Sequence, residues 1–390
     1  MLLHDLFQAY FDARRNKRKT INALKFEENY ESEIFRLYEE IENRTYRPGT
    51  SICFVTEYPV KREIFAADFR DRVVHHLLYN YISPIFERYF ITDAYSCRAG
   101  KGTHYGIKRL DRFVRSCSEN YQKDCYILQL DIKGYFMSMD KKILYNKARE
   151  KILKYLNSCG GGDLNWNLIN FLLYRIIFHD PVKNCRVRGK RENWVGLPKD
   201  KSLFFCRPGT GLPIGNLTSQ LFGNVYLMDF DSYVKHRLGL QRYSRYVDDF
   251  AIVSRQKQFL KCLPALLDIY LKENLKLKLH PRKIKVKHFT DGVDFLGGYI
   301  KPGRIYVRNR TKGNFYKTIE KFNRLARDKK GQLNREEVDH FEKSVNSYLG
   351  TLGNFNTRKL RKKMMKEVSG YWENYFYYHH RKNKLCRKRR

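Results

Sequence analysis

The chain has 390 residues and a formal charge of +36, with 77 Lys and Arg against 41 Asp and Glu. So large a positive excess predicts a polyanionic partner. The 29 Tyr and 26 Phe provide flat faces on which bases can stack, which favours nucleic acid over a membrane surface. The apolar content of 42% is enough for a folded core and excludes a basic disordered chain, and the length predicts two or three subdomains.

The nine cysteines are scattered, odd in number and form no C-x-x-C pair. This pattern predicts reduced thiols in an intracellular, cytoplasmic protein without a structural zinc site. The N-terminus acquires charge too early for a signal peptide, and no apolar run reaches membrane-spanning length. No H-E-x-x-H motif occurs, so His75-His76 is interpreted as a pair on a helix face.

The period of the apolar residues separates predicted helices from predicted strands along the chain. Helices are expected at 1–45, 71–90, 105–118, 141–155, 164–178, 216–233 and 257–273, with three more helices from residue 311 onward. Strands are expected at 51–55, near 62–66, and at 126–132, 240–246, 250–254, 276–278, 293–300 and 304–307.

Three segments have the composition of irregular structure. Residues 160–162 are three glycines and predict a flexible break. Residues 181–210 are polar, basic and contain Gly and Pro, which predicts an insertion or long loop. The last ten residues, 381–390, hold seven basic side chains and are predicted to form a disordered basic arm.

Two adjacent carboxylates, Asp248 and Asp249, stand between two β-favouring runs, so a hairpin with Asp-Asp at its tip is expected. Placing two acids side by side is costly unless a cation neutralises them, and oxygen ligands suit magnesium. The alternative interpretation is a solvated turn, since Asp is common in turns.

A third acid, Asp131, ends the apolar run Tyr126–Ile132. A buried strand can hold this side chain rigidly against the hairpin acids, and three carboxylates can then hold two metal ions for in-line displacement at phosphorus. The alternative is a cap or an ion-pair partner, since Asp readily accepts from backbone donors.

A Gly/Pro-rich turn, residues 211–215, opens the helix predicted at 216–233. Gly215 allows a ligand to approach the backbone closely, and helix N-termini attract phosphate. Taken alone, such a turn more often simply starts a helix.

Together these stretches resemble the reverse transcriptases. Residues 131–136 are similar to that family's first aspartate motif, 213–220 to its second, and Tyr246-Val247-Asp248-Asp249 to its Y-x-D-D box, in the family's order and spacing. Other segments resemble its fingers motifs and its primer-grip hairpin: 61–72, 93–102 and 295–299. The resemblance covers about residues 45–360.

The resemblance implies an α+β right-hand polymerase with fingers, a palm built on an antiparallel sheet, and a helical thumb. Its parts are expected as an N-terminal helical extension (1–45), fingers (46–120), palm (121–155 and 211–300), fingers/palm insertion (156–210), helical thumb (301–380) and basic tail (381–390).

The second motif usually reads Q-G-x-x-x-S-P in this family, but here Ile214 replaces Gln and Gln220 replaces Pro. This form is similar to the reverse transcriptases of diversity-generating retroelements of bacteria and phages. That resemblance implies error-prone cDNA synthesis opposite adenine, mutagenic retrohoming into a target gene, a structured template RNA and a small basic accessory protein. The helix end at 347–350 and residues 356–360 also resemble that group's thumb.

The resemblance also implies roles for individual residues. Asp131 and Asp248 are expected to bridge two Mg²⁺ ions, for which Mn²⁺ is a possible substitute, while the Ile132 carbonyl completes one shell and Asp249 orients or ligates. Lys61 and Arg62 are expected to clamp the deoxynucleoside triphosphate. The remaining nucleotide-binding residues are expected to be Phe136, as the steric gate under the sugar, with Ile214, Gly215 and Gln220.

Several of these roles have structural alternatives. Arg62 can be a surface arginine, and Phe136 and Ile214 can be packing residues. Lys283 is expected to protonate the leaving pyrophosphate, and Lys285 is the competing candidate. The structural alternative for both is a solvent-exposed lysine on a strand. The residues assigned to template RNA and cDNA primer have alternatives too: Arg70 and Arg98 can structure the fingers, and Gly297 and Gly298 can mark a bulge.

Two other functions compete with the retroelement enzyme. The nearest is a group II intron or CRISPR-associated reverse transcriptase, against which the changes at Ile214 and Gln220 and the missing maturase and nuclease patterns count. The other is a non-catalytic RNA-binding relative, which would keep the charge but could lose the acids. All three acids are present, and a cluster of perturbed acids usually marks a functional site.

Overall fold

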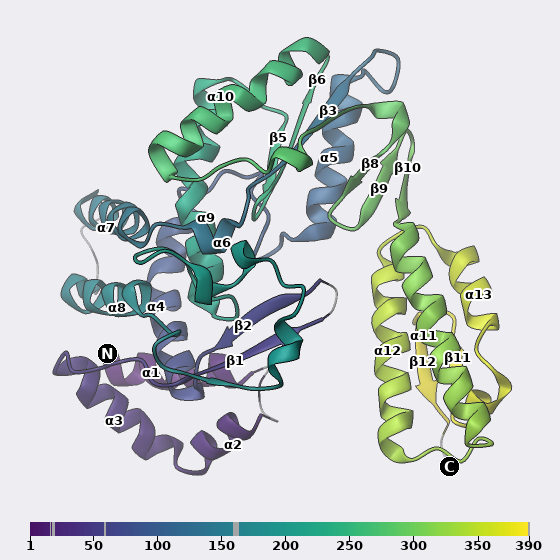
Figure 1. The fold of residues 1–390 in the computed structure, drawn as a ribbon, viewed down its shortest axis with the longest axis horizontal. Coiled ribbons are helices and arrows are strands. Elements are labelled where there is room, and N and C mark those ends of the chain that lie inside the picture. Colours follow the sequence, from purple (N-terminus) through teal and green to yellow (C-terminus); the bar gives the residue numbers. More distant parts are fainter. Residues whose placement is uncertain (16, 18–19, 58–59, 159–163, 389–390) are drawn as a thin grey trace. The chain divides into compact units, whose positions relative to one another are not determined.

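A computed structural model describes residues 1–15, 17, 20–57, 60–158 and 164–388 (Figure 1). The chain divides into two compact units, each built from separate stretches of sequence. Unit 1 comprises Met1–Gly102, Leu128–Ile252 and Lys257–Val286, and unit 2 comprises Thr103–Ile127, Val253–Gln256 and Lys287–Arg390. The glycine break predicted at 160–162 lies outside the described residues.

Helices form most of unit 1. The N-terminal helices α1 (Leu2–Arg14), α2 (Ile21–Glu28) and α3 (Tyr30–Glu42) confirm the helical region expected for residues 1–45. Helix α4 (Phe69–Glu87) begins at Asp68, whose side chain accepts from the Arg70 amide, and it packs against α1 and α9. The remaining helices of this unit are α6 (Tyr135–Ser138), α7 (Lys141–Ser158), α8 (Trp166–Phe178), α9 (Leu217–Ser232), a π-helix (Tyr233–Arg237), α10 (Lys257–Leu275) and a 3-10 turn (Pro281–Lys283).

A three-stranded sheet in unit 1 has the order β2-β1-β4. Strands β1 (Ser51–Thr56) and β2 (Arg62–Ala66) pair antiparallel, and β4 (Cys185–Val187) pairs parallel with β1. The segment 181–210 is therefore tied to the sheet by one strand and is otherwise folded into 3-10 turns, so it is an ordered insertion. Those turns are Arg191–Trp194, Lys199–Lys201 and Leu203–Phe205.

The second sheet carries the Asp-Asp hairpin and has the order β5-β6-β3-β7. Its strands are β3 (Tyr126–Asp131), β5 (Tyr243–Tyr246), β6 (Asp249–Ser254) and β7 (Lys285–His288), with β5 and β6 antiparallel. The hairpin and the strand ending at Asp131 confirm the sequence prediction.

One predicted strand was wrong. Residues 276–278 follow the end of α10, where Lys276 adopts φ +51°, and only Leu279 makes an isolated bridge, to Ile132. The alternation of Leu275, Leu277 and Leu279 resembles that of a strand, but Leu275 is the last residue of α10 and the other two leucines are buried just after it. The strand in this region, β7, lies some ten residues later in a stretch rich in lysine.

Unit 2 contains α5 (Thr103–Cys117) and a sheet of order β10-β9-β8, with a 3-10 turn (Phe289–Asp291) before it. The sheet's strands are β8 (Val293–Phe295), β9 (Gly298–Lys301) and β10 (Arg304–Val307). The three C-terminal helices were predicted correctly: α11 (Asn309–Asp328), α12 (Arg335–Gly353) and α13 (Arg358–Lys366). A 3-10 turn (Gly370–Asn374) places Trp372 on Phe341, with ring centroids 3.7 Å apart.

The disordered arm expected at 381–390 was wrong for residues 384–387. They form β12 (Lys384–Arg387), which pairs with β11 (Phe376–His379). Leu385 is buried in the core of unit 2, and Asn346 bonds both its amide and its carbonyl. Burial of Leu385 and the bonds of its backbone to the Asn346 side chain therefore stabilise this strand. The surrounding basic residues gave no sign of it in the sequence.

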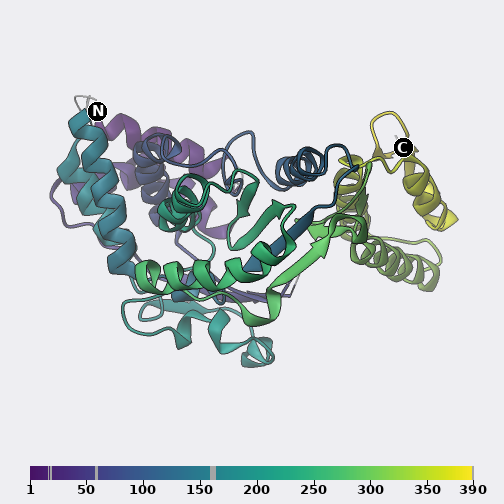
Figure 2. The same cartoon turned by 90° about the horizontal axis from the view of Figure 1, so that it is seen from above.

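In the view of Figure 2, helices and strands together form both described units, as a mixed α+β fold. Among the helices of the described residues, none is both long and apolar enough to cross a membrane. The eight described cysteines are all free thiols, in agreement with the expectation of reduced cysteines.

Candidate active site

The Asp-Asp hairpin closes through a tight turn. Tyr246 pairs with Asp249, so Val247 and Asp248 form the turn and Asp249 begins β6. Val247 adopts φ +56°, a conformation that β-branched residues rarely adopt. Such backbone strain persists only where the surrounding structure enforces it, and it occurs preferentially at functional sites.

A buried polar network beneath the turn provides that enforcement. Arg245 donates to both oxygens of Asp231, to Asn224 and to the Val247 carbonyl, the last at 3.0 Å. The Tyr243 hydroxyl donates to the same Asp231 carboxylate at 2.6 Å. The network thereby links α9 to the strand that ends in the turn.

A second buried contact fixes the Arg245 backbone. Its amide donates to the Asp93 carbonyl at 2.9 Å, and its carbonyl accepts from the Tyr95 amide at 3.0 Å. The Asp93 carboxylate in turn bonds the Lys235 ammonium at 2.8 Å, and both of these side chains are buried. Segment 93–95 therefore lies beside β5 as an additional short strand contact.

Asp131 reaches the hairpin from the end of β3. The Ile132 amide donates to the Asp248 carbonyl at 3.2 Å, which joins the end of β3 directly to the turn. On the other side, the Asp131 carbonyl accepts from the His280 amide at 2.7 Å. The sequence prediction that a strand-end acid faces the Asp-Asp hairpin is confirmed by these contacts.

The electrostatics of the three acids are those of a crowded carboxylate cluster. Burial and then the charge of Asp131 raise the pKa of Asp248 to about 6. Asp249 keeps an exposed surface, yet desolvation of its carboxyl, followed by the charges of Asp248 and Asp131, raises its pKa to about 7. Both carboxylates are thus less stable in their charged form than an ordinary Asp.

The Lys283 ammonium supplies positive charge to this cluster. Its Nζ lies 2.5 Å from Asp131 Oδ2. Desolvation opposes charge on Lys283, but the hydrogen bond and charge of Asp131 outweigh it, so the pKa of Lys283 is raised. The competitor Lys285 lies on β7, and no contact of its side chain with the three acids is present in the described residues.

The donor chemistry of the cluster fits divalent cations. Neighbouring carboxylates gain from a hard cation that neutralises their charge, and their oxygens are the ligands that Mg²⁺ prefers. As the described side chains stand, no three His, Cys, Asp or Glu groups converge on one metal position. Lys283 provides the positive charge next to Asp131 in this arrangement.

The basic residues expected to clamp a triphosphate differ in their surroundings. Arg62 is exposed at the start of β2, and its charge acts on Asp248, lowering that carboxyl's pKa as one of the smaller effects. Lys61 is engaged elsewhere: its Nζ bonds the Val195 carbonyl at 2.8 Å and lies 3.1 Å from Glu57. Arg62 therefore lies within electrostatic reach of the acids, whereas Lys61 links β2 to the insertion.

Phe136 and Ile214 are both half-buried and pack against the same small apolar cluster, which contains Phe65 and Met137. The Phe136 ring also lies on Gly223 of α9, where an added Cβ would meet the ring at 3.4 Å. These contacts fit the packing alternative for both residues without excluding a ligand on their exposed sides. Gln220 is exposed on the first turns of α9.

The structure explains why a glycine is required at position 215, which the sequence did not reveal. Its φ is +132°, and an added Cβ would lie 2.8 Å from the Phe65 carbonyl. The close approach seen in the structure is that of β2. The Phe65 amide bonds the Ile214 carbonyl at 2.8 Å, so the turn is fastened to that strand.

Arg70 and Arg98 are both held by internal contacts. Arg70 pairs with Glu40 and lies over the Tyr46 ring at 5.3 Å. Arg98 pairs with Glu87 at 2.8 Å and donates to two backbone carbonyls. These contacts fit the alternative that both arginines structure this part of the chain.

The paired glycines at 297–298 form part of a hairpin in unit 2. Phe295 pairs with Gly298, so Leu296 and Gly297 make a two-residue turn with φ +49° and +96°. An added Cβ at Gly298 would lie 3.0 Å from Ile107 of α5. The turn chemistry and this tight packing explain both glycines without a bulge.

Sequence reasoning missed the buried acids that hold the site together. Glu63, next to Arg62, is 1% exposed and accepts from Trp194, Ser202 and the Leu203 amide. Asp231 lies in the largely apolar helix α9. The available signal was an acid beside apolar residues in a predicted helix or strand, because a buried acid needs a partner.

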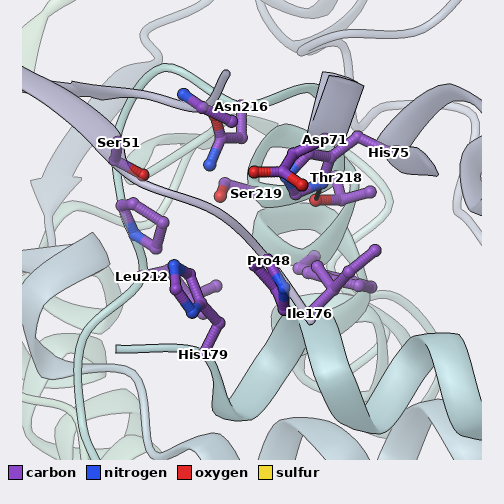
Figure 3. Close-up of a pocket in the computed structure, with 13 residues that line it drawn as sticks. Pro48, Ser51, Asp71, His75, Ile176, His179, Leu212, Asn216, Thr218 and Ser219 are labelled. Carbon is purple, nitrogen blue, oxygen red and sulfur yellow. Dashed lines mark hydrogen bonds between the residues drawn. The ribbon is translucent and has the colours of Figure 1, made fainter. Parts of the chain in front are cut away.

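A small cavity with polar and apolar lining residues lies at the start of α9 (Figure 3). Its volume is about 20 Å³, which suits a water molecule and little more. Within it, His75 Nδ1 and Thr218 Oγ1 share a hydrogen bond of 2.7 Å, and Asp71 accepts from Tyr46 and Gly49. The cavity thus belongs to the packing between α4 and α9.

Within this mixed α+β fold, the described structure brings together Asp248 in the hairpin turn, Asp249 at the start of β6 and Asp131 at the end of β3. Residues 61–300 match the family model described as "Reverse transcriptase (RNA-dependent DNA polymerase)". Because this match covers more than half of the chain, the chain belongs to the reverse transcriptase family.

Two kinds of relatives accompany this match. "Protein YkfC" of Escherichia coli (strain K12) is 25% identical over 260 residues, which cover 58% of this chain and 60% of that protein. The alignment thus spans less than two thirds of the relative's own length.

Similar solved structures include apo telomerase from Candida tropicalis, truncated from the C-terminal domain, with TM-score 0.44 and 12% identity. That alignment covers 66% of this chain and 55% of the telomerase. A telomerase from Candida albicans, in complex with a fragment of telomeric RNA, has TM-score 0.44 and 13% identity, with coverages of 90% and 62%.

Proposed function

We propose that this protein is an RNA-directed DNA polymerase that extends a cDNA primer on a template RNA. The observation that carries the proposal is the meeting of Asp131, Asp248 and Asp249 beside Lys283, where burial and then mutual charge repulsion raise the pKa of the two hairpin acids. A solvated turn would not bring in a buried third acid from a strand more than a hundred residues away.

In the proposed reaction, the primer 3′-hydroxyl attacks the α-phosphorus of a deoxynucleoside triphosphate. A new P–O bond forms, the bond to the β-phosphate bridging oxygen breaks, and pyrophosphate leaves. Asp131, Asp248 and the Ile132 carbonyl would hold two Mg²⁺ ions, or Mn²⁺ in their place, with Asp249 orienting or ligating. Such ions supply activation of the hydroxyl and stabilisation of charge on the transferring phosphoryl group.

Lys283 is the group we propose as the proton donor to the leaving pyrophosphate. It already contacts the acid cluster through Asp131 at 2.5 Å, while Lys285 does not. Arg62 would bind the triphosphate, since charge-assisted hydrogen bonds to phosphate are strong and its guanidinium is exposed near Asp248. Lys61 would act with it after releasing the Val195 carbonyl.

Phe136, Ile214 and Gln220 are proposed to border the incoming nucleotide. Phe136 would lie under the sugar as the steric gate, with its exposed edge facing the ligand. Ile214 would face the nascent base pair, and Gly215 keeps this turn tight against β2. We propose Gly297 and Gly298 as the place where the primer backbone approaches unit 2.

The proposed polymerase parts follow the sequence: an N-terminal extension over 1–45, fingers over 46–120, palm over 121–155 and 211–300, an insertion over 156–210, and a thumb over 301–380. The basic residues of 381–390 would be a charged edge of the thumb, since β12 packs on the thumb core.

Within the family, we propose the diversity-generating retroelement subclass. The motif Ile214-Gly215-Asn216-Leu217-Thr218-Ser219-Gln220 supports it, because Ile and Gln replace the usual Gln and Pro. This subclass implies error-prone copying opposite adenine, a structured template RNA and a small basic accessory protein. A cytoplasmic location stays a prediction from the cysteine pattern. That the protein is bacterial or phage-encoded is implied by the resemblance to this subclass.

The test of the polymerase is extension of a labelled DNA primer on an RNA template with Mg²⁺ and deoxynucleoside triphosphates. We expect template-length cDNA that requires all four triphosphates. RNA binding without extension, with and without the accessory protein, would favour the non-catalytic relative instead.

The test of the subclass is the error spectrum of the cDNA. Misincorporation concentrated opposite template adenine supports the retroelement enzyme. Uniform fidelity at all four template bases would favour a group II intron or CRISPR-associated enzyme.

A further inference from the structure

The insertion carries an exposed surface of aromatic and basic side chains, which we call the insertion platform: Lys199, Lys201, Phe204, Phe205 and Arg207. Phe205 is 61% exposed and Phe204 39%. The Lys199 ammonium lies over the Phe205 ring, 5.5 Å from its centroid. A large exposed ring flanked by a cation is unusual for a loop that serves only as a connection.

The platform is firmly anchored, so its exposure is built into the fold. The buried Glu63 carboxylate accepts from Trp194 Nε1 and Ser202 Oγ at 2.8 Å and from the Leu203 amide at 2.6 Å. Leu203 is buried, and Phe204 rests on Phe65 with ring centroids 5.5 Å apart. Three hydrogen bonds to one buried carboxylate thus hold the 3-10 turn that ends at Trp194 and the 3-10 turn that contains Phe205.

Within unit 1, the insertion lies against the segment that follows Asp131. The Asp200 carbonyl lies against Gly134, where an added Cβ would come within 2.8 Å of it. Gly134 follows Asp131 by three residues, and Cys206 Sγ contacts the Met137 carbonyl at 3.4 Å. In Figure 1 the teal insertion segment runs beside β1 and β2, in agreement with the pairing of β4 with β1.

The charge of the insertion is unbalanced. Residues 181–210 contain eight Lys and Arg against two Asp and Glu. Among the described side chains of this segment, the only ion pair joins Lys183 to Asp180, at 4.0 Å. The cations of the platform therefore lack carboxylate partners within the described chain, and they are available to an anion from outside.

We propose that the insertion platform binds single-stranded RNA, with a base stacked on Phe205 and the adjacent phosphates paired with Lys199, Lys201 and Arg207. An exposed ring between cations matches an unpaired base between phosphates, whereas a duplex keeps its base faces covered. An acidic protein would use the cations but not the flat ring. The inference rests on the proposed function only where it names this strand as the template ahead of the active site.

The test compares Lys199→Gln/Phe205→Ala with the matched control Lys261→Gln/Phe259→Ala, which removes one exposed lysine and one exposed phenylalanine from α10. Binding of fluorescent single-stranded RNA and of duplex RNA is measured by anisotropy over a range of salt. Loss of one stacked base predicts roughly tenfold weaker single-strand binding. Loss of one phosphate contact predicts a salt slope smaller by about 0.7.

Duplex binding should change less than about twofold, and the α10 control should match the unaltered protein in both measurements. Unchanged single-strand affinity, or equal losses for single-stranded and duplex RNA, would overturn the proposal. Preferential loss of binding to an acidic peptide would show a protein-binding surface instead. If thermal unfolding reveals destabilisation, Lys199→Gln against Lys261→Gln gives the salt-slope result alone, and an unchanged slope overturns the proposal.

A second arm identifies the RNA strand. Primer extension is compared on templates with long and short single-stranded overhangs ahead of the primer. The platform variant should lose the advantage of the long overhang, and a retained advantage would contradict the template assignment. Absence of extension by the unaltered protein would contradict the polymerase proposal but would leave the binding result intact, so the two failures are distinguishable.

Discussion

Arg245 and Asp231 form an ion pair in which the Arg245 Nη2 and Asp231 Oδ2 atoms are 2.6 Å apart and neither side chain is exposed. The same guanidinium bonds the carbonyl of Val247, the residue with φ +56° that precedes Asp248. A buried charge pair between α9 and β5 thus holds the backbone of the turn that carries Asp248.

Arg245→Met should therefore cost stability and activity together. Leaving Asp231 buried without its partner costs about 3–5 kcal/mol. Chemical denaturation measures this loss, and primer extension measures the accompanying fall in kcat. A variant as stable as the unaltered protein would contradict the burial of this pair.

The double change Arg245→Met/Asp231→Leu separates positioning from folding. Replacing both partners removes the uncompensated charge, so most of the stability should return. Extension should stay slow, because no group then holds the Val247 carbonyl. Full recovery of activity along with stability would show that Arg245 acts only through folding.

The raised pKa values of the acid cluster predict a pH-dependent stability without metal. The folded-state pKa of Asp248 is about 6, against an ordinary 3.8. A raised pKa contributes stability that is present below the unfolded value and is lost as pH rises through the folded value. In chelator, Asp248→Asn should therefore gain stability relative to the unaltered protein between about pH 4 and pH 7.

The gain is expected to be on the order of 1 kcal/mol, because one pKa unit corresponds to about 1.4 kcal/mol and solvent screens part of the effect. Thermal unfolding of both proteins across this pH range measures it. Mg²⁺ should reverse the order by stabilising only the protein with all three acids. A difference independent of pH would contradict the electrostatic crowding.

Lys283→Met tests two roles of one ammonium. If Lys283 donates the proton to pyrophosphate, kcat should fall by roughly a hundredfold, as for the loss of a general acid. Because a cation beside Asp131 is removed, less Mg²⁺ should be needed for half-maximal activity. Lys285→Met is the control; a larger fall in kcat for that variant would transfer the role to Lys285.

The hairpin and the segment after α10 show which parts of the fold could be predicted from the sequence and which could not. Tyr246–Asp249 between two β-favouring runs predicted the turn, since period and turn chemistry are local. The alternating leucines at and after the end of α10 predicted a strand that does not form. Leucines that are buried where a helix ends can have the same two-residue spacing as the buried face of a strand. At Leu385 the opposite error occurred, because the basic neighbours predicted disorder where a strand forms. Asn346, which is distant in sequence, bonds the backbone of this strand.

The candidate site divides in the same way. The acids could be predicted because the Y-x-D-D order is itself the signal. Glu63 and Asp231 could not, because their importance depends on donors that lie more than a hundred residues away or on another element. The sequence predicted a ligand close to Gly215, and the structure adds that β2 lies close to its backbone, a contact between distant segments that no local pattern reveals.

Ile214→Gln tests the fidelity role of the second motif. A glutamine would offer hydrogen bonds at the nascent base pair, and one such bond is worth about 1 kcal/mol. Selectivity opposite template adenine should therefore improve by roughly fivefold to tenfold, with correct synthesis less affected. Sequencing of cDNA made from one template measures both quantities.

Ile214→Leu is the matched control, because it keeps the apolar contacts with the cluster around Phe65. Its error spectrum should equal that of the unaltered protein. Equal spectra for all three proteins, with activity preserved, would show that Ile214 is a packing residue and that fidelity is determined elsewhere.

The most direct test of the central claim is Mg²⁺-dependent primer extension on an RNA template by Asp248→Asn, beside Asp328→Asn as an exposed control on α11. The proposed site predicts that Asp248→Asn loses extension by at least about a thousandfold while it stays folded and its RNA affinity stays close to that of the control. Extension by Asp248→Asn at the rate of the control would contradict the assignment of the acid cluster as the catalytic centre.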